Sequence, residues 1–483
     1  MALSIPHVSF EHHRAALGIG ETSPRISWRF QGNVSNWTQS SYELEIQRDN
    51  QTNTFPVDSS DSVLVPWPDD PLQSGEEAVV RVRSFGHLNQ PNSSWSEPVT
   101  VEPGLLGEED WQDAVAIASE RPTEANGTHR PIYFRKEFAV EEEVLSARLY
   151  ITALGVYEAE LNGEPVGDYV LAPGWQSYHN RHEYNTYDVT ELLQDGQNAI
   201  GVTVGEGWYS GALSWNMYRN NYGDTLGFLS LLSITTSDGE MMYVPSDDTW
   251  QSSTGPIVAS EIYNGEKYDS TQEMAGWTSP DFDASAWLGT REIDFDKTVL
   301  ASPDAPPVRR VEEQRLQRVF SSASGKTVLD FGQNLVGWLR IHVQGPRGTN
   351  VSFVHTEGIF LVVLIKANEN SDGRRRGSDS SAPQRQRHRQ HHSLRRRPSM
   401  GAIIHLPRLP VCAGDRLARR DGIECGLCHC HCDQLGHGAD GFLQLLESAA
   451  QQIPREHPVV HAWELPVHPN GLSPAGRATR MDW

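Results

Sequence analysis

The sequence predicts a mostly β protein, in which tandem antiparallel β-sandwiches are followed by a largely disordered tail. Up to about residue 357, short runs rich in β-branched and aromatic residues alternate with turn residues. After that point the alternation ends, and an Arg-rich run of low complexity takes its place. We therefore expect three β domains, at residues 1–104, 105–300 and 301–357, and a tail at residues 358–483 that does not pack.

The first domain, residues 1–104, holds strand-like runs separated by clusters of Asn, Ser, Asp, Pro and Gly. The runs read PRISWRF, SYELEIQRD, AVVRVRSFG and SSWSEPVTVEPG. Their spacing is typical of a small antiparallel sandwich. The last two runs resemble the final strands of a fibronectin type III domain. We expect a scaffold, because no residue here supports a binding role.

The second domain, residues 105–300, is centred on residues 149–211. Asn162-Gly163 stands between two alternating apolar runs and predicts a tight hairpin turn. Further strands follow at residues 227–253, and the whole predicts a jelly-roll β-sandwich. The third segment, residues 301–357, has short strands punctuated by Gly. It is too short to close a sandwich alone, so we expect only the start of one.

Aromatic residues gather in the predicted loops at the end of the jelly roll. Flat rings beside amide and carboxylate groups suit the faces of sugars. The candidate carbohydrate-binding residues are Trp175, Tyr178, Trp208 and Trp215. The alternative is that these rings pack in the core and its rim, as aromatic rings usually do. For the carboxylates Glu158, Glu160, Asp168 and Glu206, we expect solvated strand edges and turns.

Charge and cysteine content exclude several classes of protein. The formal net charge of −23 argues against nucleic-acid or anionic-membrane partners. No run approaches transmembrane length, and the N-terminus lacks a secretory pattern, so we expect a cytoplasmic protein. All 5 cysteines follow residue 411. The crowded spacing of Cys425, Cys428, Cys430 and Cys432 lacks the spacer usual in zinc sites, so we expect no metal and no cofactor.

Two long runs point to a known family. They read LNGEPVGDYVLAPGWQSYHNRHEYNTYDV and LDFGQNLVGWLRIHVQGPRGTNVSFVHTE. Both resemble the N-terminal β-domains of α-L-rhamnosidases of glycoside hydrolase family 78, over residues 5–357. The resemblance implies rhamnose-containing glycosides as partners and inverting hydrolysis of terminal α-L-rhamnose by an (α/α)6 barrel that follows the β-domains. The alternative is a carbohydrate-binding protein without catalytic activity.

Inverting hydrolysis requires one carboxylic acid and a second carboxylate that activates water. The family's acid lies in a DCPQRDERLGW-type motif, which this chain lacks in its own reading frame, so we assign no catalytic residue. Back-translation of residues 468–483, read one base later, permits IPTDCPQRDERLGWT. The codon of the acid then straddles Arg477 and Ala478.

A frame-shifted tail also explains the nine Arg between residues 374 and 399. A basic nucleic-acid-binding segment is the other interpretation.

Overall fold

The computed structural model describes residues 3–49, 51–122, 128–214 and 216–355, and the backbone of four short strands further on, at 361–366, 422–425, 428–431 and 459–463. The chain divides into two compact units, of which the first holds residues 1–256 and 270–310 and the second residues 257–269 and 311–463. The prediction of a disordered tail falls mostly outside the described residues. The predicted boundaries at residues 104, 300 and 357 stay predictions.

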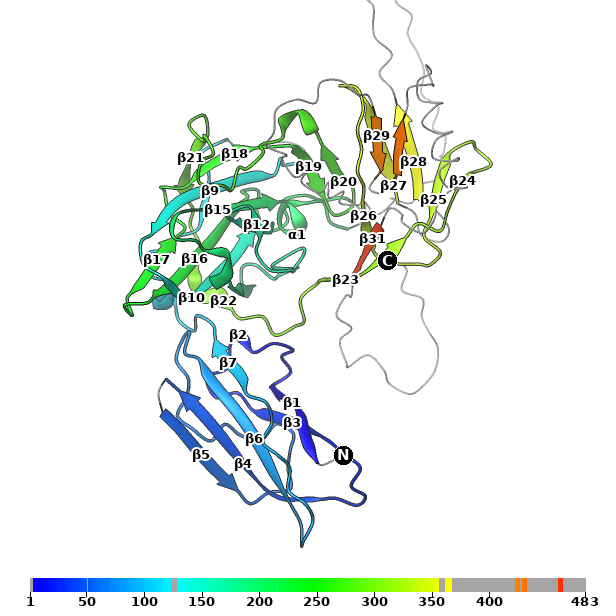
Figure 1. The fold of residues 1–483 in the computed structure, drawn as a ribbon. Helices are drawn as coiled ribbons and strands as arrows, with labels where there is room; N and C mark the ends of the chain where they lie inside the picture. The colour runs from blue at the N-terminus through cyan, green and yellow to red at the C-terminus, as the bar shows by residue number, and fades with distance from the viewer. Residues whose placement is uncertain are drawn as a thin grey trace, which may run out of the picture. The chain divides into compact units, whose positions relative to one another are not determined.

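The first unit begins with a β-sandwich of two sheets, drawn in blue in Figure 1. A two-stranded sheet pairs β1 (Ser4–Phe10) with β3 (Ile26–Gln31). A five-stranded sheet has the order β2 (Leu17–Ile19), β7 (Val99–Pro103), β6 (Ala78–Gly86), β4 (Gln39–Arg48) and β5 (Gln51–Val57). The strand pairs of these two sheets are antiparallel except for the parallel pair of β2 and β7. Alternate residues of β4 and β6 are buried, so the period of two along each strand builds one core.

The jelly roll follows within the same unit. Its strands form one hydrogen-bonded path that is open at both ends, in the order β12 (Glu164–Pro165), β11 (Val156–Leu161), β15 (Gly196–Gly205), β9 (Ile132–Val140), β18 (Gln251–Thr254), β21 (Leu288–Glu292), β8 (Ile117–Ser119), β16 (Gly227–Thr236), β10 (Val144–Leu154) and β14 (Asn185–Asp188). β17 (Met241–Pro245) pairs with β16. The prediction of a mostly β, antiparallel architecture is confirmed.

A cluster of three aromatic rings lies in the core of the jelly roll. Phe134 and Trp250 each pack against Phe228, with ring centroids 4.9 Å and 5.0 Å apart, and all three side chains are fully buried. The turn at Asn162-Gly163 has positive φ at both residues, as the sequence predicts. Short helical turns complete this unit: η1 (Glu108–Trp111), η2 (Thr190–Leu192), α1 (Gly207–Ser210), η3 (Ser270–Gln272) and η4 (Lys297–Val299).

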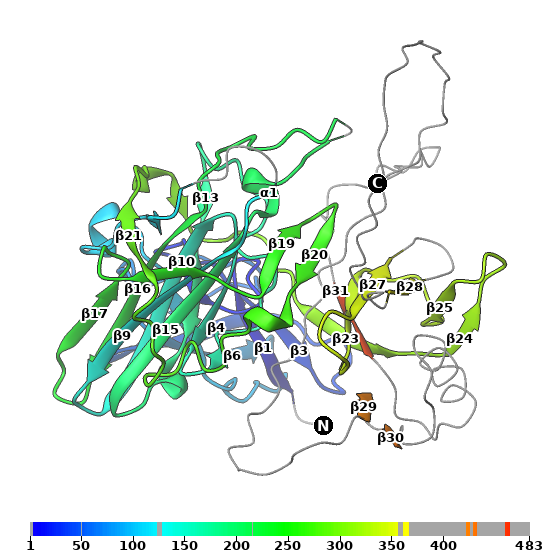
Figure 2. The same cartoon turned by 90° about the horizontal axis from the view of Figure 1, so that it is seen from above.

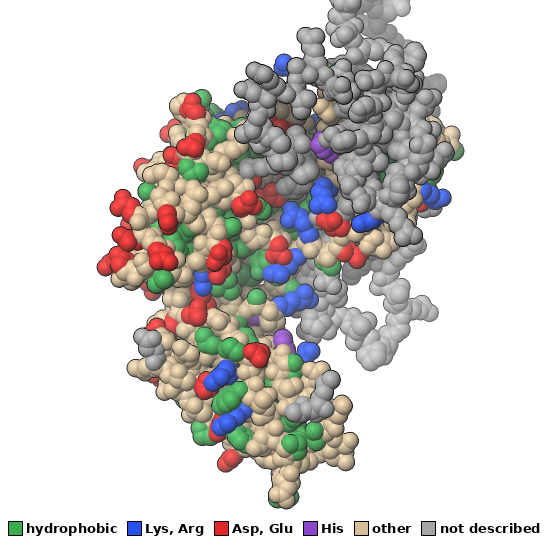
Figure 3. All heavy atoms as spheres, viewed as in Figure 1, with side chains coloured by type: hydrophobic (Ala, Val, Ile, Leu, Met, Phe, Trp, Pro, Cys, Tyr) green, Lys and Arg blue, Asp and Glu red, His purple; other side chains and the backbone are tan. Residues whose placement is uncertain are grey.

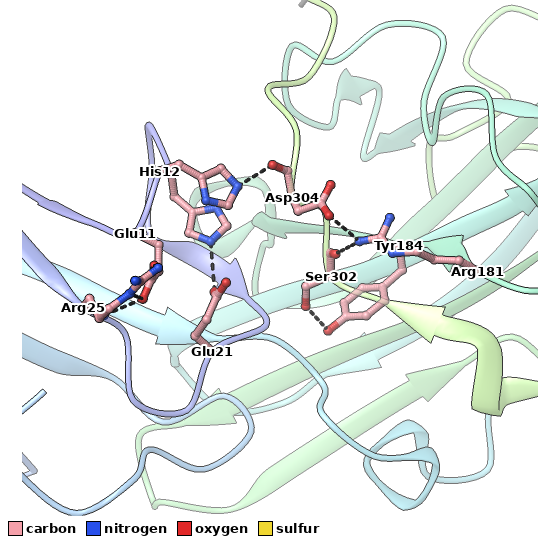
Figure 4. Close-up of polar contacts among 9 residues, drawn as sticks. Glu11, His12, Glu21, Arg25, Arg181, Tyr184, Ser302 and Asp304 are labelled. Atoms are coloured by element: carbon pink, nitrogen blue, oxygen red, sulfur yellow. Dashed lines mark hydrogen bonds and ion pairs between the residues drawn. The ribbon is translucent and has the colours of Figure 1, made fainter. Parts of the chain in front are cut away.

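The segment after η4 contacts both sandwiches of the first unit (Figure 4). It begins with β22 (Leu300–Ala301), which pairs in parallel with β13 (His182–Glu183). The Tyr184 hydroxyl lies 2.9 Å from Ser302 Oγ, and Arg181 pairs with Asp304 at 3.2 Å. His12 of the first sandwich donates to the Asp304 carbonyl. These contacts fasten the end of the jelly roll to the N-terminal sandwich.

The second unit consists of small sheets. β24 (Arg318–Ser321), β25 (Thr327–Asp330), β28 (Leu361–Lys366) and β27 (Asn350–Val354) form one sheet, and β23 (Arg310–Arg315), β31 (Val459–Trp463) and β26 (Gly337–Arg340) another. Two hairpins join β19 (Ile257–Glu261) to β20 (Gly265–Tyr268) and β29 (Gly422–Cys425) to β30 (Cys428–His431). Leu329 and Leu339 form its small core.

Candidate carbohydrate-binding site

Helix α1 places Trp208 at one end of the jelly-roll strands (Figure 2). The helix follows β15 through Glu206 and begins at Gly207, whose φ is +50°. A Cβ added there would lie 2.5 Å from Val156 Cγ1, so any larger residue would clash with β11. Close packing therefore fixes the helix on the sandwich. The Tyr209 side chain points inward and is 7% exposed, whereas Trp208 is half-buried.

Trp175 lies in the loop between β12 and β13 and is 55% exposed. The Tyr157 N–H donates to the Ala172 carbonyl at 2.8 Å and fastens this loop to β11. The rings of Trp175 and Trp208 are nearly parallel, with 5° between their planes and 6.2 Å between their centroids. We call these two residues the Trp pair. The exposed ring of Trp175 and the half-buried ring of Trp208 offer apolar faces of the kind that sugar rings cover.

The other two candidate residues have different outcomes. Tyr178 is 3% exposed and packs on Tyr209 and Tyr222, at centroid distances of 5.2 Å and 4.7 Å. Its position matches the alternative of core and rim packing, because it supports the loop and offers almost no surface. Trp215 lies outside the described residues. Of the four predicted rings, Trp175 is therefore exposed, Trp208 is half-buried and Tyr178 is buried, and the ligand role of the Trp pair stays a prediction.

Tyr222 belongs to the site, and the sequence analysis did not include it. The Trp175 Nε1 donates to the Tyr222 hydroxyl at 3.2 Å, which holds the exposed indole in place. Tyr218, in the same loop, is 62% exposed. Both tyrosines follow α1 in the run MYRNNYGD. The aromatic pattern that marked residues 175–209 continues through this run, so following it beyond Gly211 would have found them.

Glu206 is a fully buried carboxylate beneath the loop that follows α1. Its Oε1 accepts the His129 N–H at 2.6 Å and also pairs with Arg219. Burial raises the pKa of Glu206, and the Arg219 guanidinium opposes that shift. The expectation of a solvated position is wrong here, because the loop folds Arg219 back onto the carboxylate. The pair anchors the loop that carries Tyr222.

The other three carboxylates differ in exposure. Glu158 is exposed, and Asp168 keeps 57% of its side chain exposed beside Arg309, so the prediction is confirmed for these two. Glu160 is half-buried and accepts a hydrogen bond from Thr278 Oγ1 at 2.9 Å. The contacts of Asp168 with Arg309 and of Glu160 with Thr278 join segments that are far apart in the sequence.

The surface of the first unit carries many carboxylates, and Asp and Glu side chains spread over the face of the jelly roll seen in Figure 3. Within the described ranges, no group of three or more His, Cys, Asp or Glu side chains is arranged to hold a metal ion. The cysteine side chains after residue 411 lie outside those ranges. No helix in the described part of the chain has the length and apolar character needed to cross a membrane.

Three family models match the chain in succession. Residues 5–107 match the Rha78A-like N-terminal immunoglobulin domain, and residues 142–312 match the α-L-rhamnosidase N-terminal domain. Residues 321–379 match the bacterial α-L-rhamnosidase concanavalin-like domain, which continues past the predicted boundary at residue 357. The first match describes an immunoglobulin domain where we expected a fibronectin type III domain. Both classes share the sandwich architecture.

Known proteins agree with these matches. An α-L-rhamnosidase of Formosa agariphila is 31% identical over 377 residues, which cover 71% of this chain and 39% of that protein. The crystal structure of native α-L-rhamnosidase from Aspergillus terreus is 66% identical, with a TM-score of 0.73, over 74% of this chain and 42% of the other. The Streptomyces avermitilis α-L-rhamnosidase complexed with L-rhamnose has a TM-score of 0.68 at 25% identity, over 74% of this chain and 51% of that structure.

The fold and the matches relate the chain to glycoside hydrolases through its β-domains. More particularly, it carries the N-terminal region of an α-L-rhamnosidase, and the predicted resemblance to glycoside hydrolase family 78 is confirmed. The chain spans about 39% of the length of the α-L-rhamnosidases of Formosa agariphila and Alteromonas that it matches.

Proposed function

We propose that this chain serves the hydrolysis of terminal α-L-rhamnose from rhamnose-containing glycosides. The observation that supports the proposal is the order of the three matching domains, which lie one after another along residues 5–379. Proteins that match over this region are named α-L-rhamnosidases. In this proposal the described residues form the scaffold of the enzyme and its sugar-facing loops.

The chain as given is not expected to hydrolyse a glycoside by itself. An inverting mechanism needs two carboxyl groups about 6.5–9.5 Å apart, one as acid and one as base. Glu206, the fully buried glutamate of the jelly-roll loops, is bound to Arg219 and closed to solvent. We propose that the missing acid motif is encoded in the shifted frame under residues 468–483.

The gene's nucleotide sequence tests this part of the proposal. We expect the frame one base later to stay open from about codon 372 to codon 483 and to encode the DCPQRDERLGW-type motif. Stop codons in that frame before the motif would overturn it. In the same way, release of rhamnose from an aryl α-L-rhamnoside by the given chain would show that the active site lies elsewhere.

Carbohydrate binding without catalysis is the second candidate function, and the Trp pair, with its exposed Trp175 ring, favours it. Titration of L-rhamnose into the purified chain, followed by tryptophan fluorescence, tests it. We expect saturable quenching in the unmodified chain and its loss in a Trp175→Ala, Trp208→Ala double variant. Equal quenching in both proteins would rule out the Trp pair as the binding site.

A further inference from the structure

A polar cavity lies in the first unit, away from the Trp pair. Its volume is about 210 Å³, and its floor is the outer face of β10, β16 and β17. The other walls come from the N-terminal sandwich and the segment around η1. The residues used below are Gly75, Glu102, Ser146, Arg148, Tyr150 and Ser233. A single water needs only about 10–15 Å³ of such space, so the cavity has room for a small organic molecule.

The Tyr150 hydroxyl is the strongest sign that the cavity takes a ligand. The residue is 3% exposed and lines the cavity, yet its hydroxyl forms no hydrogen bond to any residue in the described part of the chain. Gly75 lies beside this hydroxyl, since a Cβ added there would stand 3.4 Å from it. The hydroxyl faces the cavity, where it is able to donate a hydrogen bond to a molecule inside.

An ion pair forms the wall next to Tyr150. Arg148 Nε lies 3.0 Å from both Glu102 oxygens, and a second Arg148 nitrogen donates to Glu102 Oε2 at 2.9 Å. Glu102 is 3% exposed, and burial raises its pKa. A carboxylate has about four lone-pair positions, so Glu102 can accept a further hydrogen bond from a ligand. Glu102 in this wall can thus accept a hydrogen bond from a ligand, while the Tyr150 hydroxyl can donate one.

The chemistry of the lining selects a class of ligand. Glu77, Glu102 and Asp110 face a single cation, Arg148, and this excess of negative charge disfavours anions. Polar walls disfavour apolar molecules, because their own hydrogen-bonding groups would be left unpaired. Neutral hydroxyl groups both donate and accept, and so match the serine, tyrosine and carboxylate groups together.

We propose that this cavity binds one neutral monosaccharide, at a site separate from the Trp pair. The Tyr150 hydroxyl would donate a hydrogen bond to one sugar hydroxyl, and Glu102 would accept a hydrogen bond from a neighbouring sugar hydroxyl. Ser146 and Ser233 would contact the rest of the sugar ring. The inference does not depend on rhamnosidase activity or on the Trp pair, because it rests on residues of another face of the unit.

The test follows the methyl group of Met241, which lines the cavity. The chain, labelled with ¹³C at its methionine methyl groups and carrying Trp175→Ala, is titrated with L-rhamnose, D-glucose, D-galactose and L-arabinose. At least one sugar should shift the Met241 signal, with a dissociation constant on the order of 1 mM. Tyr150→Phe should weaken that binding about threefold to tenfold, the value of one hydrogen bond.

Tyr157→Phe is the matched control, because Tyr157 is also buried but its hydroxyl bonds Asn185 and Tyr187 outside the cavity. It should leave the sugar affinity unchanged and lower the melting temperature. Tyr150→Phe should leave the melting temperature unchanged, so loss of binding cannot be attributed to unfolding. The proposal is overturned if none of the four sugars shifts the Met241 signal, or if Tyr150→Phe binds the sugar as tightly as the parent does. It is also overturned if only tetramethylammonium, a cation used as a probe, shifts the signal.

Discussion

At the residue scale, the Trp pair is marked by its geometry, since the 55% exposed ring of Trp175 lies nearly parallel to the half-buried ring of Trp208. We expect Trp175→Ala to weaken L-rhamnose binding at least about fivefold, since an aromatic face contributes on the order of 1 kcal/mol. Isothermal titration measures the change. Trp287→Ala is a matched control, because Trp287 stacks on Trp277 with centroids 6.1 Å apart at another place in the unit. Unchanged affinity in Trp175→Ala would contradict a ligand role for the pair.

His182 makes a pH-dependent prediction. It is 0% exposed, and burial lowers its pKa from 6.5 to about 4. The unfolded chain therefore binds more protons than the folded chain between pH 6.5 and 4, and stability falls as the pH falls through this window. We expect a loss of about 3 kcal/mol from this residue.

Urea unfolding at pH 7 and pH 4 measures this loss. His182→Gln removes the titrating group, and Gln can still donate to the Ala153 carbonyl that His182 contacts. The variant should lose about 3 kcal/mol less than the parent between the two pH values. An equal loss in the two proteins would mean that His182 is not the residue responsible.

Local chemistry decides which residues of the site can be identified from the sequence. Trp175, Tyr178 and Trp208 were found because aromatic residues in loops stand out. Their exposure was not predictable, because the burial of Tyr178 depends on Tyr209 and Tyr222, which only the folded loops bring together. The burial of Glu206 was missed for the same reason. Arg219 reaches it through a loop whose path no local pattern encodes.

At the element scale, Gly155 controls how β10 turns into β11. Its φ is +147°, and an added Cβ would lie 2.3 Å from the Gly205 carbonyl oxygen, which is backbone and cannot move aside cheaply. We expect Gly155→Ala to lower the free energy of unfolding by more than about 2 kcal/mol. Gly239→Ala is the control, because Gly239 also has positive φ but no atom within 4 Å of the added Cβ. Similar losses in both variants would mean that the contact carries no cost beyond backbone strain.

Strands and turns were predictable where the signal is local. Asn162-Gly163 forms the expected hairpin turn because both residues tolerate positive φ. The sheet order was not predictable, since β9 pairs with β15 on one side and with β18, far along the sequence, on the other. Long-range pairing of this kind depends on tertiary packing, and no pattern within one strand specifies it.

For the whole molecule, the buried pair of Arg148 and Glu102 ties the jelly roll to the N-terminal sandwich. Arg148→Met would leave Glu102 buried without its partner, and we expect a loss of about 3 kcal/mol in the free energy of unfolding. Arg81→Met is the control, because Arg81 is 38% exposed and pairs with Glu45 on the surface of one strand pair. It should cost no more than about 1 kcal/mol. Equal effects in urea unfolding would show that the buried pair contributes no special stability.

We propose that the described region is the scaffold of a rhamnosidase, and that the acid motif is encoded in a frame that this chain does not use. The most direct test compares two polypeptides on an aryl α-L-rhamnoside, the chain as given and a version translated one base later from about residue 372 through the gene's next stop codon. We predict rhamnose release by the second polypeptide alone. Release by the given chain, or by neither although the second is folded, would contradict the claim.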